Sequence, residues 1–414
     1  MDYSKISEWI LREDCFDADR LGKCEAIMSL GNGYMGLRSA AEEKYLGETR
    51  NLLVNGTFNK FDENEVTELP NAADVTAIEL WIDGERFALD QGSYSDYTRE
   101  LNIKTGELTR SVKWTAQNGK SIVFGAKRIV SLARIHDIAA QVTVTACEDM
   151  ALKIRTGISA RVTNTGSQHF SEVEKRFFDK KFMQFVEKTT QSEVAFVINS
   201  VHKFFMNDEP VDLKTDVNIE HRIVFADYNV ELKAGDTFTI EKLSNVNTTR
   251  DTDNAGLTLE ELQKKSLEDL KVSESMGYKA LAEESAAAWA EQVWDRTPIV
   301  IEGGEGTDID QFAVRFAQYH MRVFVPAHDN RMNIGAKGLS GEGYKGHCFW
   351  DTEIFLLPYY IFTAPETARK LEEYRYLSLP GAHRKAEENG YDGAMFPWEA
   401  AWLDDGETCP LYAG

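Results

Sequence analysis

The residues best suited to chemistry lie close together between positions 341 and 355, in the stretch GEGYKGHCFWDTEIF. His347, Cys348, Asp351 and Glu353 are all possible metal ligands, and His347 and Asp351 are four positions apart, on one face if the segment is helical. The spacing matches neither the HExxH motif nor the paired CxxC motif of zinc sites. The other histidines form no complementary cluster in the sequence. We therefore expect no metal site here.

Trp350 and Asp351 favour carbohydrate binding instead. An aromatic ring can pack on the apolar C–H face of a pyranose, while a neighbouring carboxylate accepts hydrogen bonds from its hydroxyls. The preceding segment, GAKGLSGEGYKG, is rich in glycine and lets the backbone approach a ligand closely. A second aromatic–acid pair, Trp398 and Glu399, follows a proline in GAMFPWEAAW. Together the two pairs predict a sugar site.

A structural alternative stays open at this point. Phe349, Trp350 and Phe355 have the composition of core aromatic residues, and Asp351 stands where a helix cap could lie. The burial of these side chains and the hydrogen bonds of Asp351 distinguish the two interpretations.

The elements that precede these residues are predominantly β. From about residue 20 to 250, segments such as AIELWIDGERFAL alternate apolar and polar residues, and DG and NG dipeptides mark short hairpins. Many such segments in series predict a large antiparallel β-sandwich, with one face of each sheet buried.

Helical periodicity follows the β region. Residues 257–271 place Thr258 and Glu261 at the spacing of a capping box, and residues 277–296 and 308–325 repeat the helical pattern. We expect three parts: a β-sandwich domain at 1–255, a helical linker at 256–307, and the first part of an all-α domain at 308–414.

Composition narrows the class of partner. The chain has 414 residues and a formal net charge of -22, which argues against nucleic acid and anionic membrane surfaces. Its first residues, MDYSKISEWILREDCF, lack the pattern of a signal peptide, and no apolar run reaches the length of a membrane span. The five cysteines are scattered, without a CxxC pair, as in a reducing compartment. We expect a cytoplasmic protein.

Longer stretches resemble one family. GLSGEGYKGHCFWDTEIFLLPYY and YRYLSLPGAHRKAEENGYDGAMFPWE are similar to the signature of glycoside hydrolase family 65, which includes maltose, trehalose, kojibiose and nigerose phosphorylases. LGNGYMGLRSAAEE, near the N-terminus, resembles the opening of that family's β domain, and we interpret its glycines as a tight turn and not a nucleotide loop. The resemblance implies a β-sandwich (a supersandwich), a helical linker and an (α/α)6 barrel, which would be incomplete in this chain.

The resemblance also implies a reaction and residue roles. Family members cleave an α-glucosidic disaccharide with phosphate and invert the configuration, which gives β-glucose 1-phosphate; no cofactor is implied, and inorganic phosphate is the co-substrate. Trp350 and Asp351 match the pair that holds glucose in subsite −1, and Trp398 and Glu399 match positions near the acceptor sugar in subsite +1. No residue here matches the catalytic general acid, a glutamate expected beyond residue 414. The stand-ins Glu342, Glu353 and Glu372 do not match it.

Because no residue of this chain matches the general acid, several interpretations stay open. The chain could be the N-terminal portion of a phosphorylase and inactive by itself. The PWE segment favours an α-1,2 or α-1,3 linkage, as in a kojibiose- or nigerose-like substrate, or trehalose. It could instead belong to a hydrolase of the same family, similar to a trehalase, or be a non-catalytic carbohydrate-binding fragment. The family resemblance also implies a possible homodimer.

Overall fold

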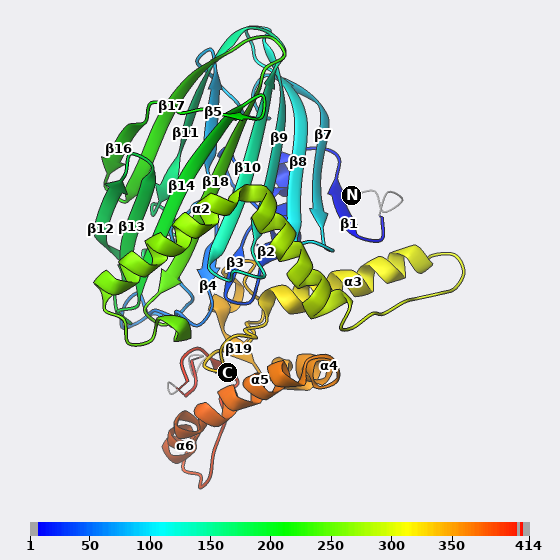
Figure 1. Ribbon diagram of the computed structural model, residues 1–414. Coiled ribbons are helices and arrows are strands. Elements are labelled where there is room, and N and C mark those ends of the chain that lie inside the picture. The colour runs from blue at the N-terminus through cyan, green and yellow to red at the C-terminus, as the bar shows by residue number, and fades with distance from the viewer. Residues whose placement is uncertain (1–6, 404–405, 409–414) are drawn as a thin grey trace.

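Two antiparallel sheets form the N-terminal region of the structure, a computed structural model that describes residues 7–403 and 406–408 (Figure 1). The larger sheet has ten strands in the order β1–β7–β8–β9–β10–β18–β14–β13–β12, with β15 paired to β14. They are β1 (Ile10–Glu13), β7 (Ser93–Asn102), β8 (Glu107–Thr115), β9 (Ser121–Val130), β10 (Asp137–Ala146), β12 (Phe170–Phe178), β13 (Phe182–Thr189), β14 (Ala195–Met206), β15 (Glu209–Pro210) and β18 (Thr237–Thr248). The predicted antiparallel β region is confirmed.

The smaller sheet has five strands in the order β16–β17–β11–β5–β6. They are β5 (Ile78–Ile82), β6 (Glu85–Arg86), β11 (Met150–Ser159), β16 (Asp216–Glu220) and β17 (Ile223–Leu232). Along β11, Leu152 and Ile154 are buried while Lys153 and Arg155 between them are partly exposed, as expected for a strand with one face on a core. Ile154 belongs to the same apolar cluster as Ile198 of the larger sheet, so the two sheets share one core.

A long bent helix, α2 (Leu259–Trp289), covers the outer face of the larger sheet (Figure 1). Thr258 and Glu261 form the predicted capping box at its start. The two helices expected at 257–271 and 277–296 are the arms of this helix, which bends at Gly277, where φ is 75°. Leu270 and Leu281 pack on Val201 and Leu243, so central strands are buried on both faces. That double burial explains why AFVINSV in β14 does not alternate.

The LGNGYMG segment forms a tight turn, as predicted, within a small sheet of β2 (Leu30–Gly31), β3 (Met35–Leu37) and β4 (Leu52–Val54). The side chain of Asn32 accepts hydrogen bonds from the backbone N–H groups of Tyr34 and Met35. At Gly33 φ is 87°, and a Cβ there would lie 1.8 Å from the carbonyl oxygen of Val325. The glycine thus permits both the turn and the close approach of the backbone at Val325.

The two acids that end the stretch LGNGYMGLRSAAEE have a structural role. Glu42 and Glu43 are buried and form ion pairs with Arg128 and Arg110 on the neighbouring strands β9 and β8. Arg110 Nη1 lies 2.7 Å from Glu43 Oε1, and Arg128 Nη2 lies 2.6 Å from Glu42 Oε1. These pairs attach residues 30–43 to the larger sheet, because separating a buried ion pair would leave an uncompensated charge.

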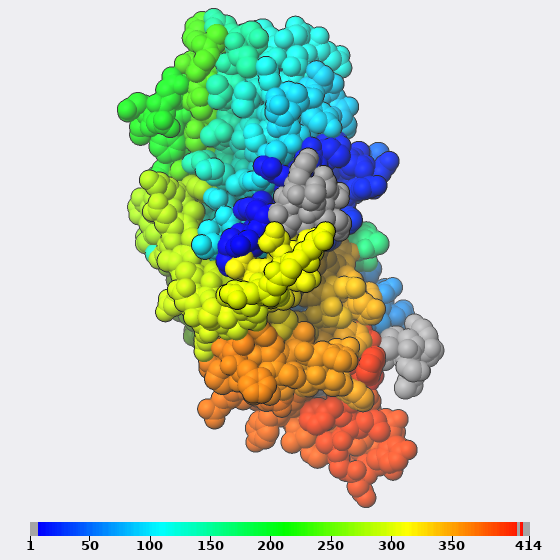
Figure 2. Space-filling model, turned by 90° about the vertical axis from the view of Figure 1, so that its right-hand side faces the viewer, coloured from blue at the N-terminus to red at the C-terminus, as the bar shows by residue number. Residues whose placement is uncertain are grey.

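The helical part starts at α3 (Thr307–Phe324), which confirms the helix expected at 308–325. Phe312 and Val323 are buried as its periodicity predicts, whereas Ile309 is exposed. Beyond it lie α4 (Leu357–Thr363), α5 (Pro365–Leu377) and α6 (Leu379–Glu388), which form a lower lobe of the molecule (Figure 2). Among the described residues these helices are too few to close an (α/α)6 barrel. Short helical segments elsewhere are η2 (Ala18–Arg20), α1 (Leu21–Ile27), η3 (Thr252–Asn254) and the π turn η4 (Ala290–Trp294).

Large apolar side chains lie exposed on this lower lobe. Phe355 and Phe362 are 70% and 87% exposed, and Ile354 and Ile361 beside them are also exposed. Apolar groups of this size gathered on neighbouring turns are typical of a surface that another element covers.

Candidate carbohydrate-binding site

A two-stranded ladder brings the two predicted aromatic–acid pairs together. The strands are β19 (Cys348–Phe349) and β20 (Glu399–Ala400), and they pair antiparallel with Cys348 opposite Ala400 and Phe349 opposite Glu399. Trp350 directly follows β19, and Trp398 directly precedes β20. Antiparallel pairing places those two positions side by side. The two pairs, far apart in the sequence, therefore lie next to each other.

The two tryptophans form an exposed aromatic corner. The rings of Trp350 and Trp398 meet edge to face, with centroids 5.3 Å apart and an angle of 79° between their planes. Their exposed fractions are 42% and 48%, whereas Phe349, whose ring also contacts Trp398, is buried. The interpretation as a core aromatic residue thus holds for Phe349 but not for Trp350 or Phe355, which are both exposed.

Asp351 is exposed and begins the π-helical turn η6 (Thr352–Leu356). It occupies the N-cap position, but its side chain makes no capping hydrogen bond. An exposed carboxylate beside an exposed indole has the donor and acceptor groups that a sugar needs, since its oxygens can accept from hydroxyls. Its placement is consistent with the predicted role.

Glu399 lies differently, with its carboxylate turned towards the interior. Oε1 is 2.8 Å from Nδ1 of His347, a ring that is completely buried, and the Glu399 side chain is only 15% exposed. The backbone N–H groups of Trp398 and Glu399 donate to the two carboxylate oxygens of Glu407, at 2.9 Å each. Glu399 is therefore a held carboxylate and not a freely moving surface acid.

The remaining acids of the motif have structural partners. Glu353 forms an ion pair with Arg375 of α5, at 2.8 Å, and accepts a hydrogen bond from Asn333. Arg375 also donates to the carbonyl oxygen of Phe349, so it fixes the end of β19. Burial lowers the pKa of Arg375, but the hydrogen bond and charge of Glu353 outweigh burial and raise it overall.

Two further glutamates show no catalytic arrangement. Glu342 accepts hydrogen bonds from Asn51 and Thr165 of the N-terminal region. Glu372 is exposed on α5, as a surface charge of a helix would be. Neither side chain contacts the tryptophan corner in the hydrogen bonds and ion pairs of the described residues.

The possible metal ligands of this stretch do not converge. Cys348 is buried, and burial raises the pKa of its thiol, which lies 3.1 Å from the hydroxyl of Tyr374. His347 and Glu353 have the separate partners given above. In the described part of the chain, one other group has ligand atoms that lie near one another: His136, Asp251 and Asp253.

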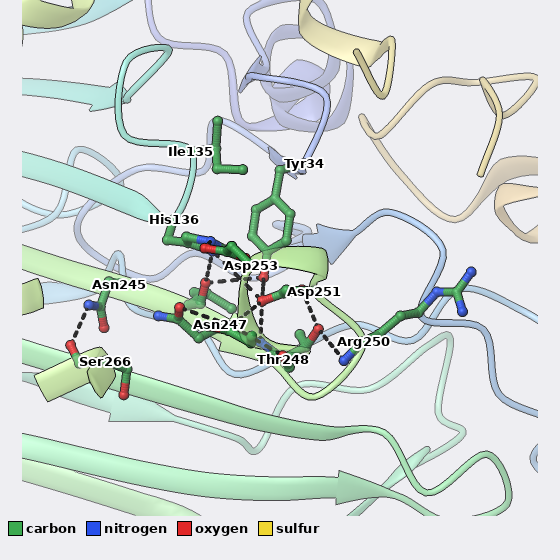
Figure 3. A network of polar contacts seen from close by, with 12 residues as sticks. Tyr34, Ile135, His136, Asn245, Asn247, Thr248, Arg250, Asp251, Asp253 and Ser266 are labelled. Atoms are coloured by element: carbon green, nitrogen blue, oxygen red, sulfur yellow. Dashed lines mark hydrogen bonds and ion pairs between the residues drawn. The ribbon is translucent and has the colours of Figure 1, made fainter. Parts of the chain in front are cut away.

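That group lies in the N-terminal region, beside Tyr34 (Figure 3). His136 Nδ1 is 3.0 Å from the carbonyl oxygen of Val246, which can only accept, so this nitrogen carries hydrogen. Burial lowers the pKa of His136, but the hydrogen bond to Asp253 and the charges of Asp251 and Asp253 raise it overall. Nε2 of His136 lies 3.1 Å from Oδ2 of Asp253 and Nδ1 lies 3.9 Å from Oδ2 of Asp251, so the ring itself lies against both carboxylates.

A loop of the N-terminal region supports the tryptophan corner from behind. The backbone N–H of Leu69 donates to the carbonyl oxygen of Lys345 at 2.9 Å, and Lys345 Nζ lies 3.6 Å from Glu68. The buried Nε2 of His347 hydrogen-bonds to the carbonyl oxygen of Thr67. Sequence reasoning missed this role of His347, and also those of Arg375 and Glu407. Polar residues close to the motif were the available sequence signals for these roles, but their hydrogen-bond partners are distant in the sequence.

Comparison with known proteins agrees with this arrangement. Residues 11–292 match the model of the Glycosyl hydrolase family 65 N-terminal domain, and residues 315–412 match that of the Glycosyl hydrolase family 65 central catalytic domain. Two successive domains of one glycoside-processing family thus follow each other in this chain, which defines its class. The chain belongs to glycosyl hydrolase family 65.

Curated relatives are similar over nearly the whole chain. It is 42% identical to a kojibiose phosphorylase of Halothermothrix orenii over 99% of its own length and 52% of the relative's. It is 38% identical to a kojibiose phosphorylase of Escherichia coli, over 96% and 51% respectively. The chain therefore spans about half the length of the curated relatives it matches.

A solved structure has the same fold. A protein described as a putative kojibiose phosphorylase from human microbiome superposes with a TM-score of 0.87 over 98% of this chain and 53% of that one, at 22% identity. At that identity the likeness concerns the fold alone. In the described residues, no helix combines the length and the apolar character that crossing a membrane requires.

Proposed function

We propose that this chain is the N-terminal portion of an inverting α-glucosidic disaccharide phosphorylase, with kojibiose or nigerose as the favoured substrate class. The observation that carries the proposal is the meeting of Trp350 and Trp398 across the β19–β20 ladder, each beside an acid, in a chain of this family. Kojibiose phosphorylases are among its curated relatives, as is a nigerose phosphorylase of Lachnoclostridium phytofermentans.

In this proposal the four predicted residues bind the disaccharide. Trp350 packs on the non-reducing glucose in subsite −1, and Asp351 accepts hydrogen bonds from its hydroxyls. Trp398 and Glu399 contact the acceptor sugar in subsite +1. The exposure of both rings supports these roles, since a sugar must reach an uncovered face.

The reaction exchanges one C1–O bond for another. A phosphate oxygen attacks C1 of the glucose from the face opposite the leaving sugar, so the α linkage becomes β-glucose 1-phosphate. The leaving oxygen receives a proton from a general acid. Phosphate is already anionic, so no base is needed to activate it, whereas an inverting hydrolase needs one for water. We assign no residue of this chain to the acid and expect that glutamate beyond residue 414.

We further propose that 308–414 is the first part of an (α/α)6 barrel, preceded by a β-sandwich domain at 1–255 and a linker at 256–307. The exposed Phe355 and Phe362 support this, because additional barrel helices would bury them. The coverage of about half of each relative is consistent with it. The same proposal includes a cytoplasmic protein that needs no cofactor, binds neither nucleic acid nor membrane, and can form a homodimer.

The test is a proton-NMR time course on the chain, after its mass has been checked. Kojibiose, nigerose, trehalose and maltose are each incubated with and without phosphate, and binding of each sugar is measured by calorimetry. We expect the chain to bind sugar without turnover. A full-length protein that has this chain as its N-terminal half should form β-glucose 1-phosphate only when phosphate is present. Glucose released without phosphate would support a hydrolase, and no binding of any sugar would contradict the site.

A further inference from the structure

His347 lies where three segments meet: the loop that contains Thr67, strand β19 and strand β20. Its ring is completely buried. Nε2 hydrogen-bonds to the carbonyl oxygen of Thr67, and Nδ1 is 2.8 Å from Oε1 of Glu399. One ring thus connects the N-terminal region to a residue of the sugar site.

Both neighbours of this ring are acceptors, which determines where hydrogen lies. A backbone carbonyl only accepts, so Nε2 carries hydrogen. With that hydrogen alone, the ring would present the lone pair of Nδ1 to a carboxylate oxygen at 2.8 Å, and the two would repel. A proton therefore lies between Nδ1 and Oε1, carried either by the ring or by the carboxyl group.

A second buried histidine shows the contrast. His169 Nε2 is 2.9 Å from Glu68 Oε1, but its Nδ1 is 3.0 Å from Nδ2 of Asn59, which is a donor. A neutral ring with one hydrogen satisfies both contacts of His169. The same neutral ring does not satisfy those of His347, so the His347–Glu399 contact needs a proton that the His169–Glu68 contact does not.

The surroundings of the pair leave one carboxylate oxygen available. Besides Glu399, the charged groups on the adjoining segments include the Lys345–Glu68 pair and Glu407, which is paired with Lys385. The ring of Phe58 lies 6.0 Å from that of His347. Oε2 of Glu399 has no hydrogen-bond partner among residues 7–403 and 406–408, and the side chain is partly exposed beside Trp398.

We propose that His347 is a positioning residue that fixes Glu399 for the acceptor sugar. The proton shared between Nδ1 and Oε1 holds one carboxylate oxygen, so that the other accepts a hydrogen bond from a sugar hydroxyl. The hydrogen bond to the carbonyl oxygen of Thr67 attaches this ring to the N-terminal region. This inference rests on the proposed function, since it takes Glu399 as an acceptor-site residue.

The first experiment needs no substitution. The ring nitrogens of His347 and the carboxyl carbon of Glu399 are observed by nitrogen-15 and carbon-13 NMR on the labelled chain at pH 7, with His169 as the internal comparison. We expect either both His347 nitrogens protonated or the Glu399 carboxyl protonated, with a single ring hydrogen on His169. A neutral His347 beside an ionised Glu399 would overturn the shared proton.

The second experiment separates the two contacts of the ring. His347→Asn keeps a donor near Nδ1, towards Glu399, whereas His347→Gln keeps one near Nε2, towards Thr67. We expect the Gln variant to bind kojibiose, whose second sugar occupies subsite +1, about tenfold more weakly, the size of a lost hydrogen bond to a charged group, and the Asn variant to lose less than about threefold. His202→Gln, at a buried histidine of β14, controls for general effects of the substitution.

The outcomes distinguish the inference from the function. If the unsubstituted chain and both His347 variants bind kojibiose equally, and Glu399→Gln weakens binding, the proposed site stands and the positioning role is wrong. If the unsubstituted chain binds no sugar, the proposed function fails and the positioning role fails with it. Because the NMR experiment uses the unsubstituted chain, a variant that does not fold leaves a decisive measurement in place.

Discussion

The indole of Trp350 stands edge-on to that of Trp398, at 5.3 Å between centroids, and both rings are about half exposed. Neither the helical lobe nor the N-terminal region covers them. Four short segments support this corner: β19, β20, the turn η6 and the loop that contains Thr67. The arrangement holds the two rings side by side while leaving both partly exposed.

Removing either indole should weaken sugar binding and leave the fold intact. For Trp350→Ala and Trp398→Ala we expect affinity for glucose or kojibiose to fall by about tenfold or more, because each ring supplies an aromatic contact surface. Isothermal titration calorimetry measures the affinity, and thermal unfolding monitors the fold. Tyr391→Ala, at an exposed aromatic outside the corner, is the matched control. Unchanged affinity in both tryptophan variants would exclude the corner as the site.

The ion pair of Arg375 and Glu353 should matter for stability. Replacing Arg375 by Ala removes the partner of a largely buried carboxylate and the donor to the Phe349 carbonyl, so we expect a loss of about 3 kcal/mol in the free energy of unfolding. Arg369→Ala, in the exposed pair with Glu373, should cost less than about 0.5 kcal/mol. Urea unfolding measures both. Equal losses would mean that burial of the Arg375 pair contributes nothing.

Replacing Gly33 should cost more stability than replacing a glycine that has the same φ but no close neighbour. Gly33 and Gly84 share a φ of 87°, but a Cβ at Gly84 meets nothing within 4 Å, whereas at Gly33 it overlaps the Val325 carbonyl. We expect Gly84→Ala to cost about 1 kcal/mol from backbone conformation alone, and Gly33→Ala about 4 kcal/mol because overpacking is added. Thermal or urea unfolding compares them. Similar values would show that the contact with the segment after α3 yields without cost.

Burial of Glu187 should make stability depend on pH. Its surroundings raise the pKa of Glu187 to about 7, chiefly because burial disfavours the charged form, and the charge of Arg222 offsets only part of that effect. Between about pH 4.5 and 7 the folded chain retains a proton that the unfolded chain has lost. The stabilisation is therefore complete below about pH 4.5 and is lost as the pH rises through 7.

The matched variant for this effect is Glu187→Gln, which cannot titrate. The stability of the unsubstituted chain minus that of the variant should fall by about 3 kcal/mol from pH 4 to 8, measured by urea unfolding at several pH values. A difference that stays constant with pH, or that rises, would contradict the raised pKa.

Much of the architecture was predictable from local patterns. Alternating residues indicated the antiparallel β region, Thr258 and Glu261 located the start of α2, and the periodicity of 308–325 located α3. These patterns are local consequences of which face is buried and of which backbone groups need a cap. In the sequence, the bend at Gly277 appeared only as a gap between two helical patterns. The positive φ of Gly277 interrupts the helical backbone, and a single glycine between two helical patterns does not show that the two helices meet in one bent helix.

The candidate site, too, was predictable in part from local sequence and in part only from the tertiary structure. The types of its residues, an indole and an acid in each of two motifs, were determined by the sequence alone, since each pair is contiguous. That the two pairs meet was decided by the β19–β20 ladder, a pairing between segments far apart in the chain. Tertiary packing decided that Trp350 is exposed and Phe349 buried. It also decided that Glu399 contacts His347, whereas the side chain of Asp351 makes no capping hydrogen bond. Hydrogen-bond partners and burial are properties of the assembled fold, because they arise from atoms that distant segments bring together.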